Sequence, residues 1–223
     1  MISLDINQYS LETIWESFNK IASGLFNDYQ LQVNESHYRL LDIEFYYFSN
    51  SVFEDIYAHK HAAQLQKGKW YFHGSGIDIT FGNGTDYGGI LIRAIAKISN
   101  EGVKEKNFIV KEIHGPLNVK TEICSNLHGV FDDKANVLQL NDVSRDRMAA
   151  LMKMPLYIIK SKRIGLNSAK DINSYFHSAN LRYIIFPALK HKDKSQIARD
   201  MQKQFPDMAT AEINQALGSR FLK

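Results

Sequence analysis

Charged and phenolic side chains stand in strand-like segments of this chain where such residues are unusual. The segment YRLLDIEFYYFSNSVFEDIYAHKH, residues 38–61, alternates in its first half, so Asp42, Glu44 and Tyr46 would share one face of a strand. Arg93 stands inside the apolar run GGILIRAI, where a guanidinium needs a carboxylate, a phosphate or an opening onto a cleft. A strand with one solvated face would also produce the alternation. The presence of Arg93 favours the interpretation that the sheet carries a polar site.

The elements that must position these side chains follow from hydrophobic periodicity. Ser10 is a predicted N-cap for a helix through about Leu25, and Gly115-Pro116 opens a second helix. Residues 49–66 and 160–180 are predicted to be mostly loop, the first with a short helix. Strands are predicted over residues 29–33, 69–73, 77–81, 88–98, 108–113, 137–140, 155–159 and 181–186. A further long strand is predicted to follow the turn at residues 34–36 and to end at residue 48. We therefore expect a single α+β domain on a curved, mostly antiparallel sheet, with flanking helices and a C-terminal helical hairpin.

Composition indicates an ordinary soluble globular protein. The chain has 223 residues, of which 44% are hydrophobic and 23% charged. The N-terminus is neither basic nor followed by an apolar run, and no apolar stretch approaches the roughly 20 residues of a membrane helix. The single cysteine, Cys124, fits a reducing compartment and is expected to be a packed structural thiol. We expect a cytoplasmic protein without a membrane partner.

The net charge of +3 comes from the tail. After Pro187 the chain carries seven Lys or Arg residues and four Asp or Glu residues, so the body is neutral. We divide the chain into a body, residues 1–188, and a basic helical appendage, residues 189–223. Its helices, predicted over residues 195–205 and 210–221, could dock on the body, join a second copy of the chain, or contact nucleic acid. Docking is the default expectation.

Two further patterns carry little chemistry. His59 and His61 form an HxH pair, but no second cluster of metal-ligating residues accompanies it, so no metal is expected. The glycines between residues 74 and 84 lack a Walker lysine and a following helix, so hairpin turns explain them better than a phosphate loop.

Taken in order, these segments resemble the alkyladenine (3-methyladenine) DNA glycosylase family, of which the chain would be a divergent member. The resemblance covers most of the body and no part of the appendage. The matching segments are IASGL with YQLQV, YRLLDIEFYY, DIYAH, WYFHGSGIDITFGNG, GGILIRAI, IHGPL, RIGL and LRYII. The resemblance implies a barrel-like sheet similar to the formyltransferase C-terminal domain. It also implies DNA base-excision repair: hydrolysis of the N-glycosidic bond of alkylated or damaged purines after base flipping, without a cofactor.

The resemblance assigns roles residue by residue. Glu44 corresponds to the general base that activates water, and Arg93 to the arginine that positions that water and the backbone. Tyr46 and His59 correspond to the side chains that hold the flipped base. This agrees with a shared face for Glu44 and Tyr46, and a fixed carboxylate suits an oxocarbenium-like sugar.

Two positions depart from the family pattern. His73 stands where the family has an aromatic wedge that enters the DNA, and Thr80 stands where it has an asparagine that screens bases. His73 fills less space, which predicts weaker flipping and leaves single-stranded nucleic acid or RNA open as an alternative partner to DNA. Thr80 would relax or change base choice. A catalytically altered or inactive nucleic-acid-binding module on the same fold is the alternative function.

Overall fold

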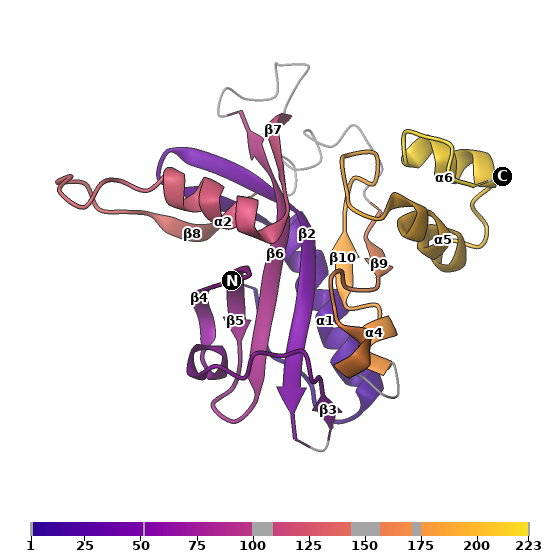
Figure 1. Ribbon diagram of the computed structural model, residues 1–223, viewed down its shortest axis with the longest axis horizontal. Helices are drawn as coiled ribbons and strands as arrows, with labels where there is room; N and C mark the ends of the chain where they lie inside the picture. The colour runs from indigo at the N-terminus through magenta and orange to yellow at the C-terminus, as the bar shows by residue number, and fades with distance from the viewer. Residues whose placement is uncertain (1, 51, 100–108, 144–156, 171–174, 223) are drawn as a thin grey trace.

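The computed structural model describes residues 2–50, 52–99, 109–143, 157–170 and 175–222, and every structural statement below concerns these residues. The chain has an α+β fold: one curled sheet whose described strands all pair antiparallel, with helices packed around it (Figure 1). The strands are β1 Tyr29–Val33, β2 Ser36–Ser49, β3 Phe53–Glu54, β4 Lys67–His73, β5 Gly76–Phe81, β6 Tyr87–Ile98, β7 Ile109–His114, β8 Leu138–Asp142, β9 Ile159–Ser161 and β10 Arg182–Ile184. The helices are α1 Leu11–Asn27, α2 Pro116–Ser125, α4 Tyr175–Ser178, α5 Lys194–Gln204 and α6 Thr210–Ala216, with 3-10 turns η1 Ala62–Leu65 and η2 Ser168–Lys170.

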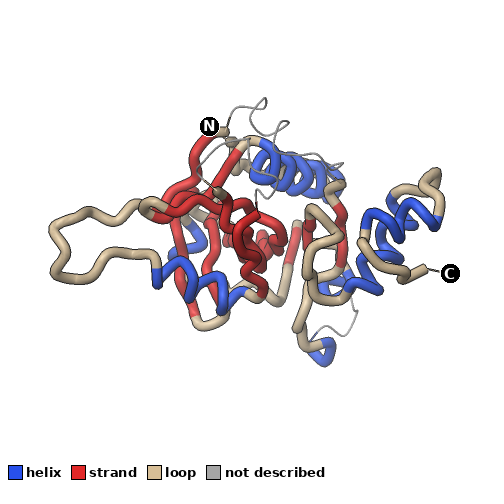
Figure 2. The backbone as a smooth tube through the Cα atoms, turned by 90° about the horizontal axis from the view of Figure 1, so that it is seen from above, coloured by secondary structure: helices blue, strands red, loops and turns tan. Residues whose placement is uncertain are grey.

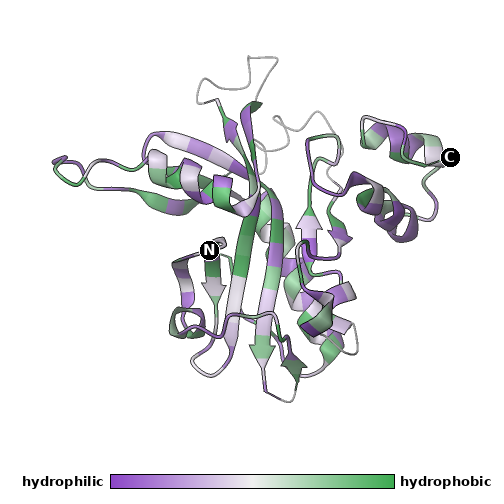
Figure 3. Cartoon of the chain, in the orientation of Figure 1, coloured by the Kyte–Doolittle hydropathy of each residue, from purple (hydrophilic) through white to green (hydrophobic). Residues whose placement is uncertain are grey.

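The long strands β2 and β6 form the centre of the sheet and lie side by side (Figure 1). One face of β2 packs on α1, where the ring of Phe18 lies 4.8 Å from Phe45 and 6.0 Å from Tyr47. Ser10 caps α1 with its hydroxyl, as predicted, and the buried stripe of the helix includes Ile14. The central strands carry much of the apolar sequence (Figure 3). Burial of this face fixes which β2 side chains point the other way.

The opposite face of the sheet carries a row of polar side chains. Strand register sets Tyr71 of β4 opposite Asp78 of β5, Asp78 opposite Leu91 of β6, and Leu91 opposite Glu44 of β2. Glu44 is in turn opposite Arg182 of β10. Directly opposed residues of antiparallel strands project to the same face. Strands β2 and β5 therefore bring two carboxylates onto one surface, separated by Leu91.

The C-terminal helices are docked on the body. Their apolar sides pack against β9 and β10 in a second cluster of fully buried residues: Ile159, Ile184, Ile197, Ala198, Met201, Ile213 and Leu217. The guanidinium of Arg182 also donates to the main-chain oxygen of Lys192. Helix α6 ends at Ala216, earlier than predicted, because Gly218 adopts a left-handed conformation with φ 66°. Figures 1 and 2 show α5 and α6 beside the β9–β10 edge.

Most predicted elements are present with shifts of one or two residues. The last strands differ more: β9 covers Ile159–Ser161 and β10 only Arg182–Ile184, and the predicted starts at Pro155 and Phe108 lie outside the described residues. Cys124, expected to be packed, is exposed on α2. Within the described ranges, no helix is long and apolar enough to span a membrane.

Candidate functional site

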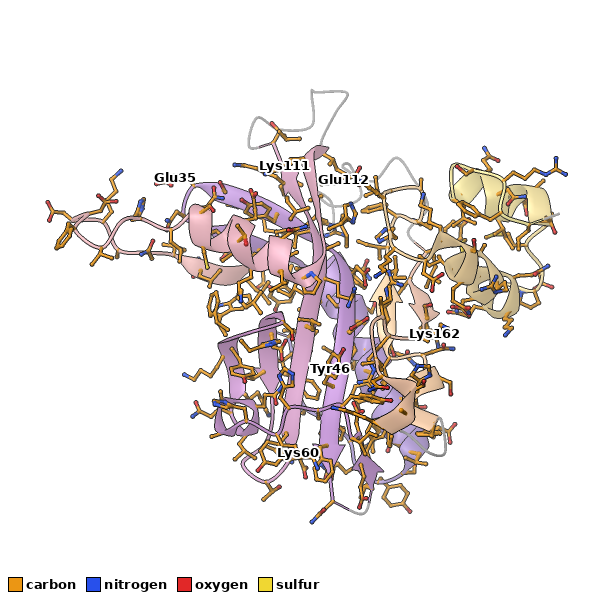
Figure 4. The ribbon with its side chains drawn as sticks, viewed as in Figure 1. Glu35, Tyr46, Lys60, Lys111, Glu112 and Lys162 are labelled. Atoms are coloured by element: carbon orange, nitrogen blue, oxygen red, sulfur yellow. The ribbon has the colours of Figure 1, made fainter. Side chains whose placement is uncertain are left out.

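A cavity of about 270 Å³ opens on the polar face of the sheet. Rings of Tyr46, Tyr57, His59 and His73 line it, and residues 164–166 close one side. Histidines apart, Asp78 and Arg93 are the charged side chains among the described residues that line it. Figure 4 labels Tyr46, which belongs to β2, on the central pair of strands. The cavity volume is just below the roughly 300–1,000 Å³ of typical ligand pockets, which suits one small ring system.

Glu44 lies directly behind this cavity and is fully buried. Its Oε2 accepts hydrogen bonds from the Tyr46 hydroxyl at 2.8 Å and from Nη1 of Arg93 at 3.2 Å. Its Oε1 accepts from the main-chain N–H of Ile164 at 2.8 Å. Tyr46, Arg93 and Ile164 all line the cavity, so each partner of the carboxylate has a surface toward the ligand space.

The Glu44–Arg93 contact differs from the neighbouring buried ion pairs. Arg182 donates hydrogen bonds to Asp42 from two nitrogens, at 3.0 and 2.7 Å. Arg163 likewise donates to Asp55 from two nitrogens, at 2.6 and 3.0 Å. Arg93 reaches Glu44 with a single nitrogen, and 3.2 Å is longer than the about 2.7–2.9 Å of a charge-assisted bond. Of these three carboxylates, Glu44 is the one that its arginine does not hold with two nitrogens.

The acidities of these carboxyls follow the same division. Burial raises the pKa of Glu44 above its usual value, and the opposing effect of Arg93 is too weak to restore it. Burial acts on Asp42 too, but Arg182 and His191 outweigh it and lower the pKa of Asp42 to about 2. A buried carboxyl with a raised pKa beside a cavity is a candidate functional group.

Imidazole and phenol rings form one wall of the cavity. The His73 ring stacks on Tyr71 with centroids 5.0 Å apart, Tyr71 stacks on His61 at 4.8 Å, and His59 meets His73 edge-on at 4.7 Å. Nε2 of His73 lies 2.9 Å from Asp78, and its Nδ1 accepts from the main-chain N–H of Ser75. Burial and the neighbouring His73 lower the pKa of His59, so its imidazole is neutral at neutral pH.

Arg163 supports the part of the cavity wall formed by Tyr46 and Tyr57. Its guanidinium donates to Asp55 and to the main-chain oxygens of Phe45 and Phe176, and its side chain is fully buried. The same group lies 4.5 Å from the Tyr46 ring centroid and 5.5 Å from that of Tyr57. It thereby fixes two cavity-lining rings and the start of the segment whose Ile164 N–H binds Glu44.

The structure brings five of the six predicted site residues together. Tyr46, His59, His73 and Arg93 line the cavity, and Glu44 lies behind it. Their assigned roles stay predictions. The side chain of His73 contacts Asp78 and is only 7% exposed.

Thr80 is the exception. It is fully buried, and its hydroxyl accepts the main-chain N–H of Lys69 at 2.9 Å, so it does not line the cavity. The side chain of Gln64 covers this end of the face: a Cβ placed on Gly89, the strand neighbour of Thr80, would lie 2.5 Å from Gln64 Nε2. Thr80 is therefore not placed to contact a base in this cavity.

Sequence reasoning missed Asp78, Tyr57 and Arg163. Asp78 had the same signal as Arg93, a charged residue inside the apolar run GIDITF. Arg163 stood in a noted motif but had no assigned role. Tyr57 stood in the matching segment DIYAH but had no assigned role either, because only the folded loop brings it to the cavity.

Two larger hollows lie elsewhere, of about 720 Å³ beside α5 and α6 and about 770 Å³ beside β7 and α2. Neither is lined by the buried carboxylates of the sheet. Across the described residues no cluster of three His, Cys, Asp or Glu side chains could hold a metal ion. Chemistry, not size, singles out the cavity above Glu44.

Comparisons with known proteins give a relative but no function. The chain is similar to an uncharacterised protein of Acanthamoeba polyphaga mimivirus, 27% identical over 209 residues that cover 81% of this chain and 91% of the viral protein. No family model matches the chain. The similarity extends over most of both chains, and because the viral protein is uncharacterised, it indicates no activity for this chain.

Proposed function

We propose that the cavity receives a nucleobase turned out of a nucleic acid strand, and that Glu44 activates the water that hydrolyses its N-glycosidic bond. The protein would be a monofunctional DNA glycosylase of the 3-methyladenine type, acting on alkylated or damaged purines. The observation that carries the proposal is the state of Glu44. It is buried behind a ring-lined cavity, has a raised pKa, and its ion pair with Arg93 consists of a single long contact.

The chemistry requires a carboxylate in such a state. The bond between the sugar C1′ and the base nitrogen breaks, its electrons leave with the base, and water adds to C1′ while losing a proton to Glu44. A base with a pKa raised toward the working pH accepts that proton better than an ordinary carboxylate. The negative charge also stabilises the oxocarbenium-like sugar in the transition state.

Arg93 and Tyr46 would prepare Glu44 for this role. Both donate to the same oxygen, Oε2, and both face the cavity. Ionised carboxylates have about four acceptor sites, and three are occupied here, so a site remains for water. Entry of that water requires a small movement of Tyr46 or Arg93, because Glu44 itself has no exposed surface.

The cavity walls suit a flat ring. Tyr46, Tyr57, His59 and His73 supply aromatic surface, which binds any base through its π face. Lys60, which follows His59 in sequence, is exposed with its ammonium 3.4 Å from the centroid of the Phe48 ring, and exposed basic side chains can contact phosphates. A base must leave the stack before an enzyme of this kind can reach C1′.

A nucleic-acid-binding module without activity is the second candidate. The observation that favours it is the complete burial of Glu44, whose partners already use three acceptor sites. In that case the carboxylate would only hold the cavity walls together.

Release of free base from methylated DNA decides between the two. The glycosylase proposal predicts free methylpurine and an equal amount of abasic site, measured by chromatography and by alkaline strand cleavage. Retained affinity for the DNA with no released base would contradict the enzyme and support the binding module.

A further inference from the structure

Three side-chain rings form a continuous stack that leads from the cavity wall to the surface of the protein. The ring of His73, in the cavity wall, stacks on Tyr71 with centroids 5.0 Å apart and planes at 25°. Tyr71 in turn stacks on His61 at 4.8 Å and 13°. Exposure rises along this ring stack: the side chain of His73 is 7% exposed, Tyr71 is half-buried and His61 is exposed.

The outer end of the ring stack is a flat ring that the chain holds in place. Nδ1 of His61 accepts the main-chain N–H of Ala63 at 3.2 Å, at the start of η1, and one face of the ring lies against Tyr71. No second ring contacts His61 in the described part of the chain, and because the residue is exposed, its other face is open to solvent. A ring that is already fixed loses little freedom when another flat ring stacks on it.

The main chain is strained where it sets this arrangement. Lys60 has a φ of 52°, in the left-handed region that residues other than glycine rarely adopt. The two histidines that flank it take different positions: His59 lines the cavity and meets the His73 ring edge-on at 4.7 Å, whereas His61 lies on Tyr71 outside the cavity. Strained backbone of this kind concentrates at binding sites, where the surrounding structure maintains it.

The segment that carries the ring stack is basic. Residues 59–73 include three lysines and no aspartate or glutamate, and Lys60, Lys67 and Lys69 are all exposed. Lys67 is paired with Asp5, and neither of the other two is paired with a carboxylate among the described residues. Sites that bind single-stranded nucleic acid combine positive charge along the backbone path with rings on which bases stack. This segment presents both.

We propose that the outer face of His61 is a stacking site for an unpaired nucleobase adjoining the cavity, and that this site makes the protein prefer single-stranded to double-stranded nucleic acid. The inference rests on the proposed function, because it takes the ligand to be nucleic acid. In a duplex each base is already stacked and paired, so it must leave both arrangements before its face can lie on His61. A base in a single strand is spared the unpairing and gains the ring contact.

Two short fluorescent DNA probes of ordinary bases test this preference: a single strand, and the same strand annealed to its complement. Dissociation constants are measured by fluorescence anisotropy at one fixed salt concentration, since phosphate contacts make affinity depend on salt. We expect the wild type to bind the single strand at least about tenfold more tightly than the duplex.

Two variants isolate the contribution of the ring. His61→Ala and His61→Phe both remove the acceptor for the Ala63 N–H, so any loss of structure at η1 is common to both, and only phenylalanine keeps a flat ring. We expect His61→Ala to bind the single strand about tenfold more weakly than His61→Phe, because one base–ring contact is lost. Tyr9→Ala, which removes an exposed ring just before α1, is the control and should match the wild type.

Equal wild-type affinity for the two probes, or binding of neither, would overturn the proposal. Equal single-strand affinities of His61→Ala and His61→Phe would overturn it as well, because the ring would then contribute nothing. Base release from methylated DNA without a single-strand preference would leave the glycosylase standing and remove the stacking site. A preference that depends on the His61 ring, without base release, would do the reverse.

Discussion

Glu44 and Arg93 meet through one nitrogen and one oxygen, 3.2 Å apart, across the central strand pair β2 and β6. The two neighbouring arginines hold their carboxylates with two nitrogens each. Bidentate pairs lock a structure, whereas a single long contact leaves a carboxylate available for another partner. The difference separates structural acids from the acid we assign to chemistry.

The raised pKa of Glu44 predicts the pH dependence of base release. A general base must be ionised, so the rate rises with pH as Glu44 loses its proton. Because burial raises its pKa, this limb of the single-turnover rate profile should lie above the ordinary glutamate value of 4.5. A rate that stays flat from below that value upward would contradict the assignment.

Arg163→Lys should destabilise the protein. Lysine cannot reproduce the fork that reaches Asp55 and two main-chain oxygens, and a buried pair that loses its geometry costs about 3 kcal/mol. Urea unfolding measures the change in free energy of unfolding. Lys162→Arg, at the half-buried neighbouring position, is the control and should match the wild type. An Arg163→Lys variant as stable as this control would show that the pair is not structural.

Asp42 should contribute to acid sensitivity. Its pKa is lowered from 3.8 to about 2 in the folded state, so its contribution is present above pH 3.8 and is lost as pH falls toward about 2. Linkage puts this contribution at about 2 kcal/mol. Asp42→Asn should therefore be less stable at neutral pH and show a shallower loss of stability over that interval. Identical slopes for the variant and wild type would be the contrary result.

Truncation after Leu189 should damage the fold and not merely the affinity for nucleic acid. The appendage covers Ile159 and Ile184, both fully buried, and exposing each costs about 1.5–3 kcal/mol. The truncated chain should melt at lower temperature or aggregate, as seen by calorimetry and light scattering. An intact, equally stable truncated protein would show that the two parts are independent.

The charge of the appendage is tested separately, with the fold intact. Lys190 and Lys192 are exposed, so Lys190→Gln with Lys192→Gln removes charge without opening the buried cluster. If the appendage binds DNA, the slope of log affinity against log salt falls by about 0.9 for each phosphate that the variant no longer neutralises. An unchanged slope would show that neither Lys190 nor Lys192 neutralises a phosphate.

The sequence predicted the sheet and the face that carries the site because strand alternation is local. Phe45 and Tyr47 face α1 while Glu44 and Tyr46 face the cavity, as their spacing required. Arg93 was recognised by the cost of burying a guanidinium. Both arguments need only neighbouring residues in one strand.

The rest depended on how distant segments fold over that face. Thr80 shares the face with Asp78, but Gln64 of η1 covers that end of the sheet, and nothing in the sequence of η1 indicates this. The His73 ring contacts Asp78, which lies in the neighbouring strand β5 opposite Tyr71. The direction of the His73 side chain therefore depends on a partner in another strand. Tyr57 and Arg163 reach the cavity only through long-range contacts.

Single-turnover base release by wild type and Glu44→Gln tests the central claim most directly. Each protein is mixed in excess with methylated DNA, and free methylpurine is quantified beside the dissociation constant of the DNA. Glutamine keeps the shape but cannot take a proton, so we expect release to fall by about a hundredfold or more while DNA affinity is nearly retained. Asp133→Asn should release base like the wild type. Equal release by Glu44→Gln and wild type would contradict the assignment of Glu44 as the general base.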